Sequence, residues 1–306
     1  MFTIKNNNDA DFQTIEMANL KGDVQAKICL NQGGRLSSLK FSNTQVIAIM
    51  PHETYSNNYA SSILFPFVNR IKDGKYFFNK KNYTLAINEV ERNNALHGLV
   101  FNKTFALDDQ EINQDYTSVK LSYTDKGLNS GFPFKFKIEL NYKLTNDGLN
   151  LKITVINEDK SAFPFCVGWH PYFISEDLYN SYLHFNCDKK LVLDDQFIPT
   201  GYNDFKTEMP FKIKNNKLDD GYLLKSNNIN FITPKYKLEI SSSHTENYLQ
   251  VFTPEQENTI AIEPMTAVPN SFNNKIGLQI LEPGEKYNIE WTLKFKENNK
   301  LVSEIY

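Results

Sequence analysis

Hydrophobic and polar residues alternate over long stretches of this chain, most clearly in residues 134–144. The apolar positions there are Phe134, Phe136, Ile138, Leu140, Tyr142 and Leu144, and the positions between them hold Lys, Glu or Asn. A period of two residues predicts a strand with one buried face. The turn signal at 145–148 is followed by apolar residues at alternate positions from Leu149 to Val155. The two segments are therefore predicted to form an antiparallel hairpin.

The same alternation recurs in residues 119–123, 236–240 and 287–295, the last after a turn signal at 282–285. No stripe with a 3.6-residue period is longer than two turns, and strands and helices do not alternate along the chain. Strands at this spacing predict an all-β fold, a large antiparallel β-sandwich with few short helices. No internal repeat or break in composition divides the chain, so we expect one domain over residues 1–306.

The composition limits where the protein works and what it binds. No apolar run approaches the roughly 20 residues of a membrane-spanning helix, and the first residues lack the basic and apolar regions of a signal peptide. Three cysteines without CxxC spacing, Cys29, Cys166 and Cys187, indicate neither a disulfide framework nor a zinc site. The net charge is -3 without a basic cluster. We therefore expect a cytoplasmic protein that binds neither nucleic acid nor membrane.

Residues 165–173 place one histidine among aromatic residues and directly before a proline. Proline biases the preceding residue towards an extended backbone, so His170 is predicted to lie at the end of a strand. A titratable group between aromatic side chains suits the binding of a sugar ring beside a proton donor. The alternative is a histidine packed in the core, which is the ordinary position of a lone histidine in an apolar strand.

Two further segments place basic or titratable side chains where a strand meets a loop. Arg70 comes after a Pro-interrupted apolar run in the segment 65–71, and its fork of donors suits sugar hydroxyls. The alternative is a surface arginine paired with Asp73. His97 precedes Gly98, which lets the backbone fold closely around the imidazole. For His97 a purely structural role is the alternative.

Carboxylates mark two more segments. Asp219 and Asp220 precede Gly221, a pattern that by itself is typical of a solvated turn. Glu263 ends an apolar run before a proline, where partial desolvation would raise its pKa towards values useful for a general base. The alternative is an exposed glutamate at a strand end. Glu263 and His170 form an acid and base pair if the fold brings them together across a pocket.

Taken together, these segments resemble the aldose 1-epimerase (galactose mutarotase) family, and the resemblance runs through most of the chain. Its motifs follow one another in the family's order: residues 33–39, Asn69-Arg70-Ile71, His97-Gly98, residues 168–173, residues 249–253, Glu263-Pro264 and Pro269-Asn270. The resemblance implies the family's large β-sandwich with an open cleft on a concave sheet. It also implies that Arg70 and His97 bind the sugar, that His170 is the acid and that Glu263 is the base.

The family's sugar-binding aspartate maps onto Asp219, with Asp220 as an adjacent competitor, and Trp169 or a nearby phenylalanine would give a stacking surface. The implied reaction interconverts the α and β anomers of a free hexose such as galactose or glucose. Glu263 removes the proton of the anomeric hydroxyl while His170 protonates the ring oxygen, and the opened ring closes on the other carbonyl face. No metal or redox cofactor is needed. The expected partner is a small sugar, bound by a monomer or a homodimer.

The chain also departs from the family's pattern. After His97-Gly98 many relatives carry a tryptophan, whereas residues 100–105 contain phenylalanine, so the sugar preference is expected to differ. A hexose-6-phosphate 1-epimerase is the second hypothesis, with Lys72, Lys75, Lys103 and Lys275 as candidate phosphate-binding residues. A non-catalytic carbohydrate-binding protein is the non-enzyme alternative. A zinc hydrolase with His97, His170 and Glu263 as ligands is the remotest possibility.

Overall fold

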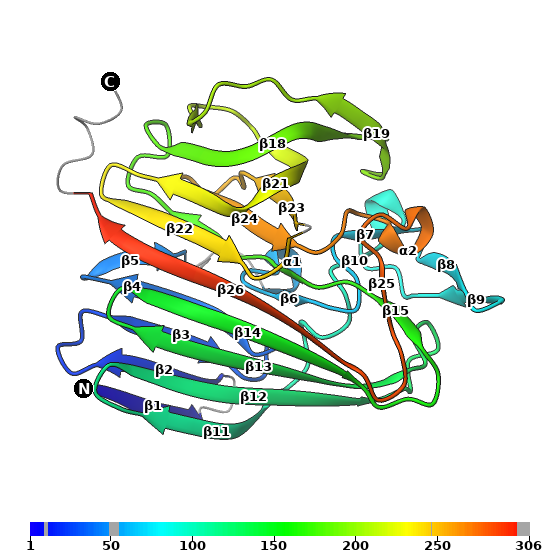
Figure 1. Cartoon of the computed structure of the whole chain (residues 1–306), viewed down its shortest axis with the longest axis horizontal. Helices are drawn as coiled ribbons and strands as arrows, with labels where there is room; N and C mark the ends of the chain where they lie inside the picture. The colour runs from blue at the N-terminus through cyan, green and yellow to red at the C-terminus, as the bar shows by residue number, and fades with distance from the viewer. Residues whose placement is uncertain (9–11, 49–54, 246, 299–306) are drawn as a thin grey trace.

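The computed structural model describes residues 1–8, 12–48, 55–245 and 247–298, and strands dominate it (Figure 1). Its described helices are single turns, namely α1 (Tyr55–Asn58), α2 (Ser271–Asn274) and the 3-10 helix η1 (Val90–Arg92). The long strands pair in antiparallel fashion. The prediction of an antiparallel all-β fold with few short helices is confirmed.

One layer is a run of six strands that contains the predicted hairpin. In pairing order these strands are β11 (Ala106–Ile112), β12 (Tyr116–Lys126), β13 (Lys135–Thr145), β14 (Gly148–Asn157), β26 (Lys286–Glu297) and β22 (Tyr236–Ser242). Leu144 pairs with Leu149 at the closed end of the β13–β14 hairpin. The antiparallel hairpin predicted around the turn signal at 145–148 is confirmed.

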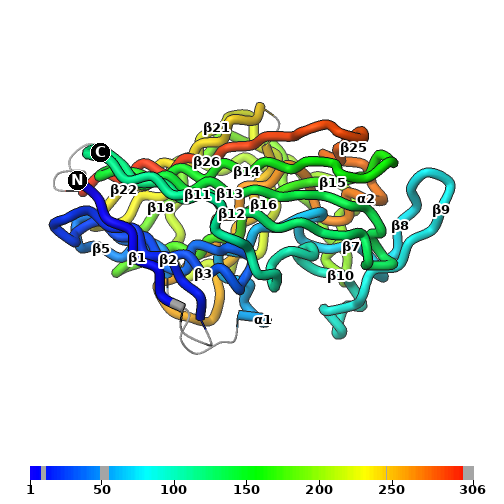
Figure 2. The backbone as a smooth tube through the Cα atoms, turned by 90° about the horizontal axis from the view of Figure 1, so that it is seen from below, coloured from blue at the N-terminus to red at the C-terminus, as the bar shows by residue number. Residues whose placement is uncertain are grey.

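The second layer lies against the first, and Figure 2 shows the two layers one above the other. In pairing order its strands are β1 (Phe2–Asn8), β2 (Gln13–Asn19), β3 (Gln25–Cys29), β4 (Arg35–Phe41), β5 (Thr44–Ile47), β17 (Tyr172–Ile174), β24 (Thr259–Met265) and β23 (Asn247–Phe252). Two short strands extend it beside β24, β16 (Gly168–Trp169) and β6 (Ile63–Leu64).

Both layers share one long strand, β21 (Asp219–Ile232). Its first half, residues 219–224, pairs with β23, and its second half, residues 228–232, pairs with β22. Strand β18 (Tyr182–Leu193) runs along both halves of β21, and it also pairs with β19 (Pro199–Asp204) and β20 (Phe211–Lys212). This arrangement joins the two layers at one edge of the sandwich.

The core fills the space between the layers with large apolar side chains. Phe41 of β4 stacks on Phe295 of β26, with ring centroids 5.2 Å apart, and Trp169 of β16 stacks on Trp291 of β26 at 6.5 Å. Both tryptophans are fully buried. Buried aromatic pairs of this kind contribute about 0.5–1.5 kcal/mol each beyond the area that they bury. They fix which face of each strand is directed inward.

Three two-stranded ribbons project from the sandwich on the right of Figure 1. They consist of β7 (Arg70–Lys72) with β10 (Asn94–Leu96), β8 (Lys75–Phe78) with β9 (Lys81–Thr84), and β15 (Phe163–Phe165) with β25 (Gln279–Leu281). The β7–β10 ribbon carries two of the predicted site residues. Among the described residues, no helix has the length and apolar character to span a membrane.

Candidate active site

The predicted acid and base lie side by side on neighbouring strands. His170 directly follows β16, as its position before Pro171 predicts, and Glu263 lies within β24. Gly168 pairs with Met265, which sets the two strands in register. Nε2 of His170 is 3.5 Å from Oε1 of Glu263, and their side chains are only 6% and 2% exposed. The exposed strand-end glutamate considered as an alternative is therefore wrong.

Side-chain alternation separates His170 from its neighbour Trp169. The ring of His170 stacks on Tyr172, two residues on, at 5.0 Å, whereas Trp169 stacks on Trp291 in the core and is 0% exposed. Adjacent residues in an extended segment point to opposite faces of the sheet. This corrects the expectation that Trp169 offers a stacking surface to a sugar, because its ring lies on the core side.

Strand β21 brings Asp219 next to these groups through β23. Gln250 of β23 pairs in register with Glu263 on one side and with Gly221 on the other, and its Nε2 donates to Oδ1 of Asp219 at 2.7 Å. Asp220 instead forms an ion pair with Lys190 at 2.7 Å. The solvated turn considered for this segment is wrong, because both aspartates begin a strand, and Asp219 is the one bonded to Gln250.

Gln250 is a site residue that the sequence hypothesis left without a role. It is 3% exposed, and its amide connects the strand of Asp219 to the strand of Glu263. A buried polar side chain needs hydrogen-bond partners, so a glutamine between the apolar residues Leu249 and Val251 is a local anomaly in the pattern. This polar residue within an apolar strand is the sequence signal that could have identified Gln250 as a site residue.

The β7–β10 ribbon holds Arg70 and His97 together. Arg70 pairs in register with Leu96, and the backbone N–H of His97 donates to the carbonyl of Asn69 at 2.8 Å. The guanidinium is paired with Glu89, with Nη2 to Oε1 at 2.8 Å, and is 12% exposed. The alternative partner Asp73 is therefore wrong.

The backbone conformation at His97-Gly98 explains why residue 98 is a glycine. His97 has φ 63° and Gly98 has φ 78°, both in the left-handed region. A Cβ on residue 98 would lie 2.3 Å from the carbonyl oxygen of Phe65. Only glycine permits so close an approach, and it turns the chain so that the His97 ring meets the edge of the His170 ring, with centroids 4.9 Å apart.

Several polar atoms of this cluster are buried without a protein partner among the described residues. They are Nδ1 of His97, Nδ1 of His170 and Oε2 of Glu263. Unsatisfied buried polar atoms are rare and indicate a bound polar molecule or a functional role. These three atoms belong to one contact network, so the cluster has unused hydrogen-bonding capacity.

Burial and neighbouring charges perturb the pKa values of the cluster. Burial lowers the pKa of His170 to about 4, and burial together with the charges of His170 and Arg70 holds the pKa of His97 well below its usual range. Burial and the charge of Asp219 raise the pKa of Glu263, and Arg70 reduces that rise. Burial also raises the pKa of Asp219. Groups perturbed in opposite directions within one cluster are typical of acid and base catalysis.

A metal site and a separate cavity are the two alternatives to the His170 cluster as an active site. In the described part of the chain, no group of three or more His, Cys, Asp or Glu has an arrangement that could hold a metal ion, so the zinc hypothesis gains no support. A cavity of about 570 Å³ lies beside Asn88, Phe101, Tyr123 and Asp125. Its lining contains no histidine and a single carboxylate, so it lacks the acid and base pair of the His170 cluster.

A family model and two relatives match this chain in sequence. A family model described as aldose 1-epimerase matches residues 13–294. The uncharacterized protein YihR of Escherichia coli is 29% identical over 292 residues, which cover 90% of this chain and 91% of that protein. The maltose epimerase of Levilactobacillus brevis is 32% identical over 130 residues, 40% of this chain and 38% of that protein.

Solved structures share the fold. A galactose mutarotase-like protein from Clostridium acetobutylicum has a TM-score of 0.87 at 23% identity and covers 97% of this chain and 99% of its own. The galactose 1-epimerase of Lactobacillus acidophilus has a TM-score of 0.77 at 18% identity, with the same coverage of 97% and 99%. At these identities the likeness concerns the fold alone, and the predicted sandwich is confirmed by it.

Proposed function

Because the chain belongs to the aldose 1-epimerase family, we propose that it is an isomerase that interconverts the α and β anomers of a free hexose such as galactose or glucose. The observation that carries this proposal is the 3.5 Å contact between Nε2 of His170 and Oε1 of Glu263. The anomeric oxygen and the ring oxygen of an aldopyranose are bonded to the same carbon. A base for one and an acid for the other must therefore lie close together.

The reaction transfers two protons and breaks one bond. Glu263 takes the proton of the anomeric hydroxyl, the C1–O bond of the ring breaks as the C1 carbonyl forms, and His170 gives a proton to the ring oxygen. Rotation about the C1–C2 bond presents the other carbonyl face, and closure reverses both transfers. Each positioned acid or base typically supplies roughly 10²–10⁴-fold in rate.

The proposed chemistry depends on which member of the buried pair holds a proton. Since burial lowers the pKa of His170 to about 4 and raises that of Glu263, a single proton on the pair is favoured on the carboxyl group. Ring opening in the assigned roles uses the form with the proton on His170. The positive charge of Arg70 offsets part of the rise in the pKa of Glu263 that burial and Asp219 cause.

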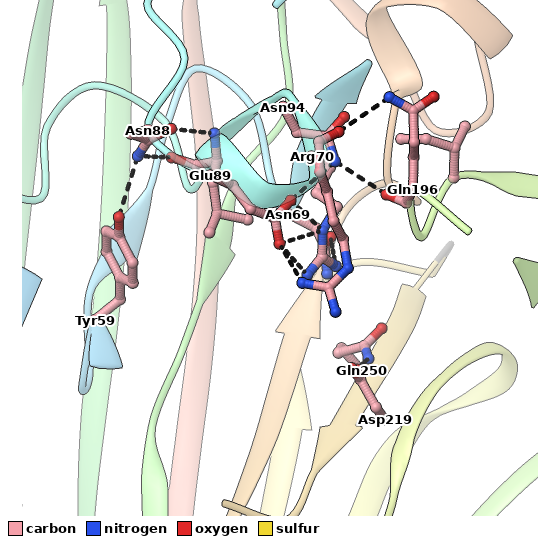
Figure 3. A network of polar contacts seen from close by, with 12 residues as sticks. Tyr59, Asn69, Arg70, Asn88, Glu89, Asn94, Gln196, Asp219 and Gln250 are labelled. Atoms are coloured by element: carbon pink, nitrogen blue, oxygen red, sulfur yellow. Dashed lines mark hydrogen bonds and ion pairs between the residues drawn. The ribbon is translucent and has the colours of Figure 1, made fainter. Parts of the chain in front are cut away.

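Sugar hydroxyls are assigned to the polar groups around the pair. Arg70 and His97 approach from the β7–β10 ribbon, whereas Asp219 and Gln250 approach from β21 and β23. Figure 3 shows Arg70 between the turn that carries Glu89 and the strands that carry Asp219 and Gln250. Donors and acceptors on two sides of the His170–Glu263 pair suit a ligand with hydroxyls around its whole ring.

The phosphosugar alternative finds little support in the candidate lysines. Lys72 is paired with Asp194 at 3.3 Å, the Lys275 ammonium donates to the carbonyl of Phe272, and Lys103 lines the separate cavity. These three lysines are thus engaged at separate places rather than with one another. The carbohydrate-binding alternative leaves the buried His170–Glu263 pair without a purpose, because binding alone does not require it.

Polarimetry tests the proposal directly. The purified protein is expected to accelerate the relaxation of freshly dissolved α-D-glucose or α-D-galactose to the anomeric equilibrium. The panel also includes maltose, since one relative is named a maltose epimerase, and glucose 6-phosphate. A many-fold preference for the phosphate would favour the second hypothesis. Binding of aldoses without acceleration of any of them would favour a carbohydrate-binding protein.

A further inference from the structure

Arg70 is held by a carboxylate that lies outside the set of sugar-contacting residues. Its Nε donates to Oε2 and Oε1 of Glu89 at 2.8 and 3.1 Å, and its Nη2 donates to Oε1 at 2.8 Å. Nη1 donates to Oδ1 of Asn69 at 3.0 Å. A guanidinium has five N–H donors, and these bonds occupy one hydrogen on each nitrogen. Two N–H groups of Arg70, one on each Nη, are left for a ligand.

Glu89 is itself fixed by three side chains (Figure 3). Besides Arg70, Nδ2 of Asn94 donates to its Oε2 at 2.8 Å, and Nη1 of Arg92 donates to its Oε1 at 3.3 Å. Burial alone would raise the pKa of Glu89, but the hydrogen bonds from Arg70 and Asn94 and the charges of both arginines outweigh it and lower the pKa. The charged form of the carboxylate is therefore favoured, and three side chains hold it beside the guanidinium.

The residues around Glu89 also form hydrogen bonds with the segment between β18 and β19. Nδ2 of Asn94 also donates to the carbonyl of Gln196 at 2.9 Å, and Nε2 of Gln196 donates to the carbonyl of Arg92 at 2.9 Å. The guanidinium groups of Arg70 and Arg92 lie 4.9 and 4.3 Å from the ring centroid of Phe197. Residues from three separate parts of the chain thus converge on the position of one arginine.

Without Glu89, other carboxylates would compete for Arg70. The charge of Arg70 already acts on Asp219 and on Glu263, lowering the pKa of each. An arginine freed from its partner would move towards these anions, because a paired guanidinium is more stable than an unpaired one at a partly buried site. It would then occupy the space in which the sugar hydroxyls bind.

We propose that Glu89 is a positioning residue that holds Arg70 away from the catalytic carboxylates and directs its two remaining N–H groups at adjacent sugar hydroxyls. This inference rests on the proposed function. Arg70 binds hydroxyls that take no part in the bond changes, so its contacts act on the ground state and the transition state alike. Loss of its orientation should appear in KM rather than in kcat.

The test compares Glu89→Gln with Glu139→Gln. Glu139 of β13 is a matched control, because it is 16% exposed against 11% for Glu89 and also binds two cations, Lys120 and Lys137, on a different strand layer. For Glu89→Gln the KM for the preferred aldose is expected to rise about tenfold while kcat changes less than about threefold. For Glu139→Gln both constants should stay unchanged.

A readout without sugar separates the inference from the proposed function. In a ¹⁵N spectrum of the arginine Nε–H groups, Arg70 should give a slowly exchanging resonance in the wild type and in Glu139→Gln but not in Glu89→Gln. If that resonance persists in Glu89→Gln, or if KM is unaltered, the inference is wrong. If the wild type turns over no aldose, the proposed function is rejected. If the Arg70 resonance is nevertheless present in the wild type and lost in Glu89→Gln, the positioning role of Glu89 is retained.

A second variant covers the case in which Glu89→Gln does not fold. Asn94→Ser removes one of the donors that fix Glu89 and leaves the carboxylate in place. It should raise KM in the same direction but by less than Glu89→Gln, with faster exchange of the Arg70 Nε–H. An unchanged KM together with an unchanged exchange rate in this variant would also contradict the inference.

Discussion

The carboxylate of Glu263 lies 3.5 Å from the imidazole of His170, and both groups are almost completely buried. Neither group has another ion-pair partner within the described part of the chain, and Oε2 of Glu263 has no hydrogen-bond partner there. Burial of ionisable groups with so few partners opposes folding.

Glu263→Gln is expected to stabilise the protein at pH 7. The pKa of Glu263 is raised in the folded state, so between about pH 4.5 and that raised value the native state holds more protons than the unfolded state. Stability therefore falls as pH rises through this window. A neutral amide removes the cost, and the free energy of unfolding should increase by about 1–3 kcal/mol in urea titrations.

Glu139→Gln is the control with the opposite sign. Hydrogen bonds from Lys137 and Lys120 outweigh burial and lower the pKa of Glu139, so its charge favours folding. This variant should lose about 0–1 kcal/mol, as is usual for ion pairs at a surface. A loss of stability in Glu263→Gln would contradict the account of a costly buried carboxylate.

Acid should destabilise the protein through His170. Its pKa is about 4 in the folded state against 6.5 ordinarily, so between these values the unfolded state binds more protons and stability falls as pH decreases. The full effect of such a shift is about 3 kcal/mol. The unfolding free energy of the wild type minus that of His170→Asn should therefore decrease from pH 7 to pH 4.

His97 acts in the same direction, because its pKa is also lowered, and Glu263 acts against both. The comparison of variants is therefore needed to isolate His170. His184 lies exposed on β18, so His184→Asn is the control for the substitution itself, because it removes no buried side chain. A wild type and a His170→Asn variant with parallel stability profiles would show that His170 is not buried in its neutral form.

Substitution of Trp169 should affect stability and leave sugar binding intact. Its ring stacks on Trp291 inside the core, so Trp169→Phe and Trp291→Phe are expected to lose similar amounts, about 1–3 kcal/mol, in thermal or urea unfolding. The KM for sugar should change little in either variant. A rise in KM of tenfold or more in Trp169→Phe alone would restore Trp169 as a sugar-stacking residue.

Gly98→Ala should be far more damaging than Gly284→Ala, although both glycines have φ 78°. An added Cβ at residue 284 meets nothing within 4 Å, so only the left-handed backbone is penalised, by about 1–2 kcal/mol. At residue 98 the Cβ would lie 2.3 Å from a backbone oxygen, and the His97 ring would have to move. Equal stabilities and equal activities of the two variants would show that this turn does not position His97.

The strands could be predicted from the sequence because their signal is local. A period of two in residues 134–144 and a turn signal at 145–148 suffice to define the β13–β14 hairpin. The candidate residues were found at strand ends by their residue types and the family resemblance. Their proximity needed the fold, because the contact between His170 and Glu263 joins residues on separate strands.

Sequence reasoning failed where the answer depended on the third dimension. Alternation places Trp169 and His170 on opposite faces but does not say which face is the core. Asp219 and Asp220 carry a turn signal that strand pairing with β23 overrides. The partner of Arg70 is Glu89, nineteen residues away along the chain, whereas the nearer Asp73 looked equally suitable.

The central claim is that His170 and Glu263 act as a pair of proton-transfer groups, and polarimetric kinetics of two variants tests it most directly. His170→Asn and Glu263→Gln should each lower kcat for the preferred aldose by roughly 10²–10⁴-fold, while the Kd for the same sugar, measured by calorimetry, changes less than about threefold. If either variant keeps a kcat within about threefold of the wild type, the assigned role of that residue is contradicted.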